Sequence, residues 1–144
     1  GTVKDNITYR APHASDGAML RAAKISGADE FIRRHPKGYE MPIGERGAGL
    51  SGGQRQSIGI ARSFLFDTPI IMMDEPSNAM DQTTEARLLK NIKEHVSDRT
   101  AIYVTQKMTL LDVVERVIVM HQGNIYLDGP KEQVLKELQG GGNA

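Results

Sequence analysis

Apolar residues in the first part of the chain recur at the spacing of helices. Within residues 15–36 they fall three or four positions apart, which predicts a helix with a capping Ser15 or Asp16 at its start and a break at Gly27. A Gly-rich loop follows. After it, residues 51–65 again place their apolar side chains on one face, so a second helix is expected to begin there.

From Asp67 onward, short apolar runs alternate with helical segments. The predicted strands are 69–75, 100–105 and a pair within 116–130 joined at a Gln-Gly-Asn turn; the predicted helices are 83–96, 109–114 and 131–138. Apolar strands alternating with helices are typical of a parallel sheet covered on both faces. We therefore expect a helical part over residues 1–66, a sheet-containing part over 67–138 and a flexible tail over 139–144.

Composition excludes several classes of protein. The 144 residues include 18 basic and 18 acidic side chains, so no net field favours nucleic acid or an anionic membrane. There is no cysteine, which excludes disulfides and thiolate metal sites. Apolar runs such as 70–73 and 117–120 are too short to span a bilayer. The four histidines lack the spacing of a metal site, and we expect them to have structural or surface roles.

Two consecutive carboxylates end the predicted strand at 69–75. Ligands of parallel α/β sheets bind at the carboxyl ends of the strands, where Asp74 and Glu75 would lie. Asp74 could hold Mg²⁺ through water, because Mg²⁺ keeps several waters and takes only one or two carboxylates. Glu75 could orient or polarise a water that attacks a phosphoryl group. The alternative is a pair of acids that cap the turn at Pro76.

Residues 50–54 read LSGGQ, with two glycines directly behind a serine where a helix is expected to start. Bare N–H groups and the positive end of a helix dipole form an anion site, and glycine lets a phosphate approach because no Cβ stands in its way. Ser51 adds a hydroxyl donor, and Gln54 adds side-chain contacts or orders the loop. The alternative is an ordinary serine cap with flexible glycines.

Together these stretches resemble the core of an ATP-binding cassette (ABC) ATPase. LSGGQ at 50–54 is similar to the family's signature motif, IIMMDE at 70–75 to its Walker B strand, and SNAMD at 77–81 to its D-loop. The resemblance covers residues 1–138 and implies ATP and Mg²⁺ as cofactors. The implied fold is α/β: the C-terminal part of a P-loop NTPase cassette, with a helical subdomain followed by part of a mostly parallel sheet with flanking helices.

The resemblance also implies a role for each candidate residue. In the family, the signature faces the γ-phosphate of ATP held by the opposite cassette. The ATP-binding residues that this implies are Ser51, Gly52, Gly53, Gln54 and, in the D-loop, Asp81. Asp74 takes the place of the metal-binding carboxylate, and Glu75 takes that of the catalytic carboxylate. The second catalytic candidate is Gln106, at the position of the family's switch residue.

Within the family the chain resembles exporters, most of all the subgroup that drives type I secretion. GERG at Gly44–Gly47 is similar to the loop through which exporter cassettes touch their transmembrane domain. The expected partners are thus a transmembrane domain and a second cassette, identical or different. The resemblance implies ATP hydrolysis coupled to transport at the cytoplasmic face of the inner membrane. Nucleic acid is not an expected partner, because the long coiled coils of DNA-repair relatives have no counterpart here.

Two departures from the family pattern leave alternatives open. No Gly-Lys dipeptide occurs, so the Walker A loop, G-x-x-x-x-G-K-[ST], is absent and is expected upstream of these residues. We therefore expect the isolated chain not to hydrolyse ATP. Gln106 follows Thr105 where the switch motif has histidine, and its amide donates a hydrogen bond but does not titrate near neutral pH. The chain is either the C-terminal part of an exporter ATPase or a non-hydrolytic half-cassette that binds or regulates a partner.

Overall fold

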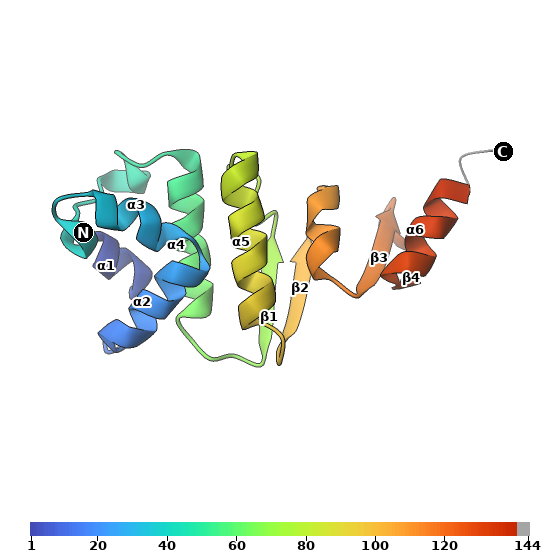
Figure 1. Ribbon diagram of the computed structural model, residues 1–144, viewed down its shortest axis with the longest axis horizontal. Coiled ribbons are helices and arrows are strands. Elements are labelled where there is room, and N and C mark those ends of the chain that lie inside the picture. Colours follow the sequence, from blue (N-terminus) through green and yellow to red (C-terminus); the bar gives the residue numbers. More distant parts are fainter. Residues whose placement is uncertain (141–144) are drawn as a thin grey trace. The chain divides into compact units, whose positions relative to one another are not determined.

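The computed structural model describes residues 1–140; residues 141–144, the end of the predicted tail, lie outside the described residues. Two compact units make up the chain, residues 1–106 and 107–144 (Figure 1). The change of pattern near Asp67 falls inside the first unit. None of the helices in residues 1–140 is long and apolar enough to cross a bilayer.

The first unit combines helices with a two-stranded sheet. Its helices are α1 (Val3–Ile7), α2 (Asp16–Ile25), α3 (Ala28–Arg34), α4 (Gly52–Phe64) and α5 (Gln82–His95), and its strands are β1 (Ile70–Asp74) and β2 (Thr100–Val104). Short 3₁₀ turns occupy Gly38–Glu40 and Glu45–Gly47. Helix α5 runs alongside the two strands, and α1 to α4 gather on its other side (Figure 1). Buried side chains from the helices and from β1 form one continuous core.

Local sequence signals set the ends of these helices. The hydroxyl oxygen of Ser15 accepts a hydrogen bond from the N–H of Ala18 (3.2 Å), so Ser15, not Asp16, caps α2. Gly27 separates α2 from α3 at a φ of 76°, a conformation that glycine adopts without steric strain. Helix α1, not singled out by the apolar spacing, starts at a capping box in which Thr2 and Asp5 exchange hydrogen bonds.

Strands β1 and β2 pair in parallel, as the sequence predicts, with Met72 opposite Ile102. Within the first unit, the prediction that the sheet is covered on both faces is wrong. Alternate residues Ile71 and Met73 point into the core, but the opposite face is open. The exposed side chains on that face are Ile70 (56%), Met72 (71%), Ile102 (44%) and Val104 (59%). We call these four residues the open sheet face; the helices of the first unit cover only the other face.

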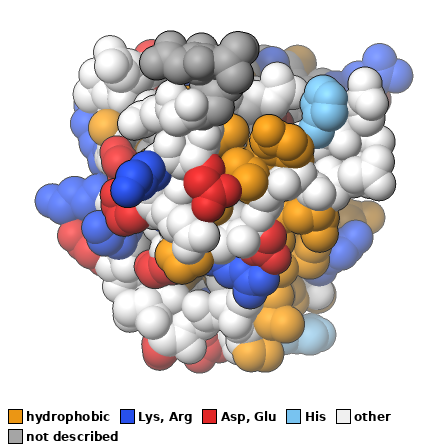
Figure 2. Space-filling view, turned by 90° about the vertical axis from the view of Figure 1, so that its right-hand side faces the viewer, with side chains coloured by type: hydrophobic (Ala, Val, Ile, Leu, Met, Phe, Trp, Pro, Cys, Tyr) orange, Lys and Arg blue, Asp and Glu red, His pale blue; other side chains and the backbone are white. Residues whose placement is uncertain are grey.

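The second unit contains a 3₁₀ helix at Met108–Val113, strands β3 (Arg116–His121) and β4 (Asn124–Pro130), and helix α6 (Lys131–Gly140). The strands form an antiparallel hairpin, as predicted. Its turn residues Gln122 (φ 49°) and Gly123 (φ 79°) both have positive φ. A two-residue hairpin turn with this geometry matches the right-handed twist of the two strands that it joins. Figure 2 shows one face of the molecule, on which hydrophobic side chains lie among acidic and basic ones.

Candidate active site

Ser51 is the N-terminal cap of α4. Its hydroxyl oxygen accepts a hydrogen bond from the N–H of Gln54 (3.2 Å), and the side-chain oxygen of Gln54 accepts one from the N–H of Ser51 (2.9 Å). Because the hydroxyl oxygen acts here as acceptor, its hydrogen is left to donate to a ligand. The cap and the anion site are therefore compatible, and Gln54 orders the loop by closing the capping box.

Close packing against Ala79 is a structural reason for glycine at positions 52 and 53, and sequence analysis did not identify it. A Cβ on Gly53 would lie 3.1 Å from the carbonyl oxygen of Ala79, and one on Gly52 would lie 3.3 Å from the Ala79 Cβ. The first turn of α4 thus packs closely against residues 77–81. The stretches similar to the signature and to the D-loop are therefore neighbours in space.

Glu75 occupies a strained turn directly after β1. Its φ is 43°, in the left-handed region that few residues other than glycine adopt, and its N–H donates to the carbonyl oxygen of Val104 (2.8 Å). Its carboxylate accepts hydrogen bonds from the Thr105 hydroxyl (3.0 Å) and from the backbone N–H of Gln106 (3.0 Å). The two catalytic candidates, Glu75 and Gln106, are thus brought together at the end of β2.

Asp74 is the last residue of β1. It is exposed at the end of β1, on the same side of the sheet as Met72, and it borders a hollow of about 260 Å³ whose wall also includes Gln56 and Pro76. Residues 1–140 contain no group of three or more metal-ligating side chains. An exposed carboxylate at the end of a parallel strand suits Mg²⁺, because that ion keeps most of its water and needs only one or two protein ligands.

Asp81 caps the next helix, α5. Its carboxylate accepts hydrogen bonds from the N–H (3.0 Å) and the hydroxyl (2.7 Å) of Thr84. These two bonds hold the pKa of the Asp81 carboxyl below its ordinary value, and the bond from the backbone N–H has the larger effect. Nearby, the buried Ser77 hydroxyl donates to the buried carboxylate of Glu85. Side chains at both ends of residues 77–81 thus fasten the segment to α5.

Gln56 was missed by sequence analysis. Its side-chain N–H donates to the carbonyl oxygen of Glu75 (2.8 Å), and its side-chain oxygen accepts a hydrogen bond from the N–H of Ala79 (2.9 Å). We call this pair of bonds the Gln56 bridge. No local pattern identifies it, because its partners lie 19 and 23 residues further along the chain.

The GERG segment forms a 3₁₀ turn directly before the signature. Gly47 has a φ of 79°, and a Cβ there would overlap the side chain of Arg55. The Arg55 guanidinium in turn donates to the carbonyl oxygen of Leu50 (2.6 Å). A hollow of about 330 Å³ opens beside the segment, with Arg46, Arg55 and Arg62 among its lining residues. The turn is thereby held against α4.

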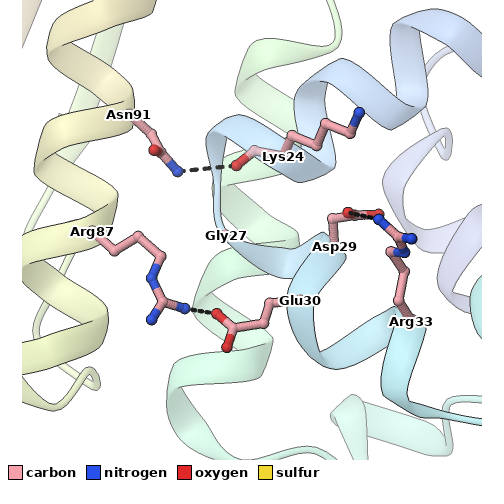
Figure 3. A pocket seen from close by; sticks show the side chains of 7 residues that line it. All are labelled: Lys24, Gly27, Asp29, Glu30, Arg33, Arg87 and Asn91. Atoms are coloured by element: carbon pink, nitrogen blue, oxygen red, sulfur yellow. Dashed lines mark hydrogen bonds and ion pairs between the residues drawn. The ribbon is translucent and has the colours of Figure 1, made fainter.

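Another hollow, of about 380 Å³, lies between α5 and the turn that joins α2 to α3 (Figure 3). Arg87 of α5 forms an ion pair with Glu30, and the Asn91 amide donates to the carbonyl oxygen of Lys24 (3.1 Å). None of the candidate residues lines this hollow. Its polar contacts join α5 to the helices that support α4, so we place the candidate active site at the β1 end and not here.

Comparisons with known proteins show which proteins this chain is similar to. The family model described as ABC transporter matches residues 2–78. The cyclolysin secretion/processing ATP-binding protein CyaB of Bordetella pertussis is 37% identical over 93% of this chain and 19% of its own length. The ATP-dependent lipid A-core flippase of Desulfotalea psychrophila is 36% identical over 94% of this chain and 24% of its own.

Among solved structures, a bacterial Atm1-family ABC exporter with ATP bound matches with a TM-score of 0.87 and 32% identity. The match covers 94% of this chain and 24% of the exporter chain. The chain thus spans about a fifth to a quarter of the length of these relatives. The identities to a secretion protein and to a flippase differ by one percentage point, so they do not indicate which class of substrate an exporter containing this chain would transport.

Proposed function

The chain belongs to the ABC transporter family, and we propose that it supplies the C-terminal part of the nucleotide-binding domain of an exporter that couples ATP hydrolysis to transport across a membrane. The observation that carries this proposal is the contact between two functional segments. The capped N-terminus of α4, with Ser51, packs against residues 77–81, while Glu75 is held at the adjoining turn.

The α4 N-terminus acts as the anion-binding part of the site. The N–H groups at the start of this 13-residue helix carry the positive end of its dipole, and the Ser51 hydroxyl adds a donor beside them. Ser51 is exposed and Gly52 and Gly53 are half-buried, so this end of the helix is accessible from solvent. In our proposal, they bind the γ-phosphate of ATP held by a second cassette.

Glu75 acts as the group that positions the attacking water. Two hydrogen bonds, from Thr105 and from the Gln106 backbone, fix its carboxylate while each oxygen keeps a further acceptor site. Bound at Asp74, Mg²⁺ would neutralise phosphate charge. The Gln106 side chain is exposed beside Glu75 and can donate a hydrogen bond to the phosphate or to the water.

The Walker A loop binds the phosphates of ATP, and we call it the phosphate cradle. The motif does not occur in the 144 residues, so in our proposal the cradle is supplied from outside them. We therefore propose that the isolated chain does not hydrolyse ATP and that the complete protein does. In our proposal, the Gly44–Gly47 turn contacts the transmembrane domain, and the cassette lies at the cytoplasmic face of the inner membrane. A non-hydrolytic binding module is the less favoured role, because Asp74 and Glu75 are both present and the relatives bear the names of transport proteins.

Ser51→Arg in the complete, membrane-assembled protein tests the proposal. Arginine puts bulk and positive charge where a phosphate has to enter, so ATP-dependent association of the two cassettes and ATP turnover should both be lost. ATP binding to the separate cassettes should persist, since the phosphate cradle is untouched. Ser97→Arg, at an exposed loop position, is the matched control. Retention of ATP-dependent association by Ser51→Arg would argue against a signature site shared between cassettes.

A further inference from the structure

We propose that Gln56 is a positioning residue that ties the placement of the catalytic Glu75 to the signature helix of the same cassette. The inference rests on the proposed function. It starts from the Gln56 bridge, which runs from the middle of α4 to both ends of the turn at residues 75–79.

The partners of the bridge fix the orientation of the Gln56 amide. The Glu75 carbonyl oxygen accepts a hydrogen bond and the Ala79 N–H donates one, so a flipped amide would place donor against donor and acceptor against acceptor. Both distances, 2.8 and 2.9 Å, are those of well-formed hydrogen bonds. The side chain is half-buried, which limits competition from water. Gln56 is thus a defined two-point contact and not a loose surface glutamine.

The bridge reaches a turn whose geometry is strained. Glu75 adopts a positive φ, and a residue in that region persists only when its surroundings hold it there. The N–H of Asn78 also donates to the Glu75 carbonyl oxygen, at a longer 3.3 Å. Losing the shorter bond from Gln56 would leave the Glu75 peptide less constrained. The direction of its carboxylate would then vary, although the carboxylate itself is untouched.

The other end of the bridge lies beside the signature. Gly53 approaches the Ala79 carbonyl oxygen, while Gln56, one turn further along α4, accepts from the Ala79 N–H. A displacement of α4 is therefore transmitted to Ala79 and Glu75 through the same side chain. In a pair of cassettes, Ser51 serves one ATP and Glu75 the other, so Gln56 would connect the two ATP sites through a single helix.

The test uses Gln56→Met in the complete, membrane-assembled protein. Methionine keeps the length of the side chain and a similar helix propensity but removes both hydrogen bonds. We expect kcat for ATP to fall about tenfold while KM stays within about twofold, because a misplaced carboxylate slows the chemical step and leaves ATP binding intact. ATP-dependent association of the cassettes and the thermal unfolding midpoint should be unchanged.

Gln56→Glu is the second variant. It keeps an acceptor for the Ala79 N–H but sets an oxygen against the Glu75 carbonyl oxygen, so its kcat should also fall about tenfold. Gln133→Ala is the control, because it removes an exposed glutamine that donates to Glu137 of its own helix. This control should retain the wild-type kcat.

The outcomes separate the inference from the function on which it rests. Wild-type protein without MgATP turnover would overturn the proposed function itself. Wild-type turnover together with an unchanged kcat in Gln56→Met would overturn only the role of Gln56. A parallel loss of kcat, KM and thermal stability would also overturn it, since Gln56 would then hold the fold and not the position of Glu75. If Gln56→Met fails to fold, the same criteria apply to Gln56→Glu.

Discussion

At Gln106 the backbone and the side chain have separate tasks. The backbone N–H donates to the Glu75 carboxylate, and this bond depends on chain geometry and not on residue type. The side chain is exposed and is available to a ligand. A substitution at this position can therefore change the contact with phosphate while the support of Glu75 persists.

Gln106→His should raise the ATPase rate of the complete protein about tenfold. Loss of a preorganised donor typically costs about 2.7–4 kcal/mol. A glutamine amide replaces a histidine partly, so the deficit in this protein should be roughly 1–2 kcal/mol, which is on the order of tenfold in rate. Steady-state phosphate release measures the effect. No change, or a fall, would mean that the site is adapted to glutamine or that this cassette is the degenerate member of an asymmetric pair.

Sequence analysis identified the candidate site residues that belong to local motifs and missed Gln56, whose contacts lie far along the chain. Glu75 and Ser51 stand out because a carboxylate after an apolar strand and a serine before a helix are local signals. Gln56 has no such signal, since its role exists only when α4 lies beside the turn after β1. The same holds for Gly53, which we assigned to phosphate access and which also packs against Ala79.

At the scale of elements, two glycines of α4 allow the effect of close packing to be compared with that of helix propensity. Gly53 and Gly59 both lie in this helix, yet only Gly53 has a neighbour that a Cβ would crowd. Gly59 has nothing within 4 Å of the place of its Cβ. Propensity alone predicts that alanine stabilises the helix at both positions.

Gly59→Ala should raise the free energy of unfolding by about 0.5–1 kcal/mol. Gly53→Ala should bring no such gain, or a loss, because its Cβ would lie 3.1 Å from the Ala79 oxygen. Urea unfolding of the two variants and the wild-type chain measures the difference. Equal stabilisation by both substitutions would show that α4 is free to move away from residues 77–81.

The elements themselves were largely predictable, with informative exceptions. Capping residues and apolar spacing identified α2, α4 and α5, and the Gln-Gly-Asn turn identified the β3–β4 hairpin. Helix α1 is only five residues long and is too short for a periodic pattern. The continuous apolar run of β1 suggested burial on both sides. The amino-acid composition of a strand does not show whether the same chain supplies helices that pack on both faces of its sheet.

At the scale of the whole molecule, the open sheet face is the main unsatisfied feature. Four apolar side chains from β1 and β2 are 44–71% exposed on one side of a parallel pair. A two-stranded sheet also has unpaired backbone groups along both outer edges, which can pair with another chain. Such a surface favours association when nothing else covers it.

The isolated 144-residue chain should therefore be a dimer or larger oligomer. Light scattering coupled to size-exclusion chromatography, over a wide range of concentrations, measures its mass. Ile102→Lys places a charge on the open sheet face and should weaken the association, whereas Lys93→Ala, at an exposed position of α5, is a control that should not. A clean monomer of the wild-type chain at every concentration would contradict this expectation.

The most direct measurement is ATP turnover and ATP binding by Glu75→Gln in the complete, membrane-assembled protein. The substitution removes the carboxylate charge that we propose positions the water, while Ser51 and the phosphate cradle remain. We expect turnover to be abolished and ATP binding to be retained at the wild-type affinity. Wild-type turnover by Glu75→Gln, or loss of ATP binding, would contradict the assignment of Glu75 as the catalytic carboxylate of an ABC ATPase.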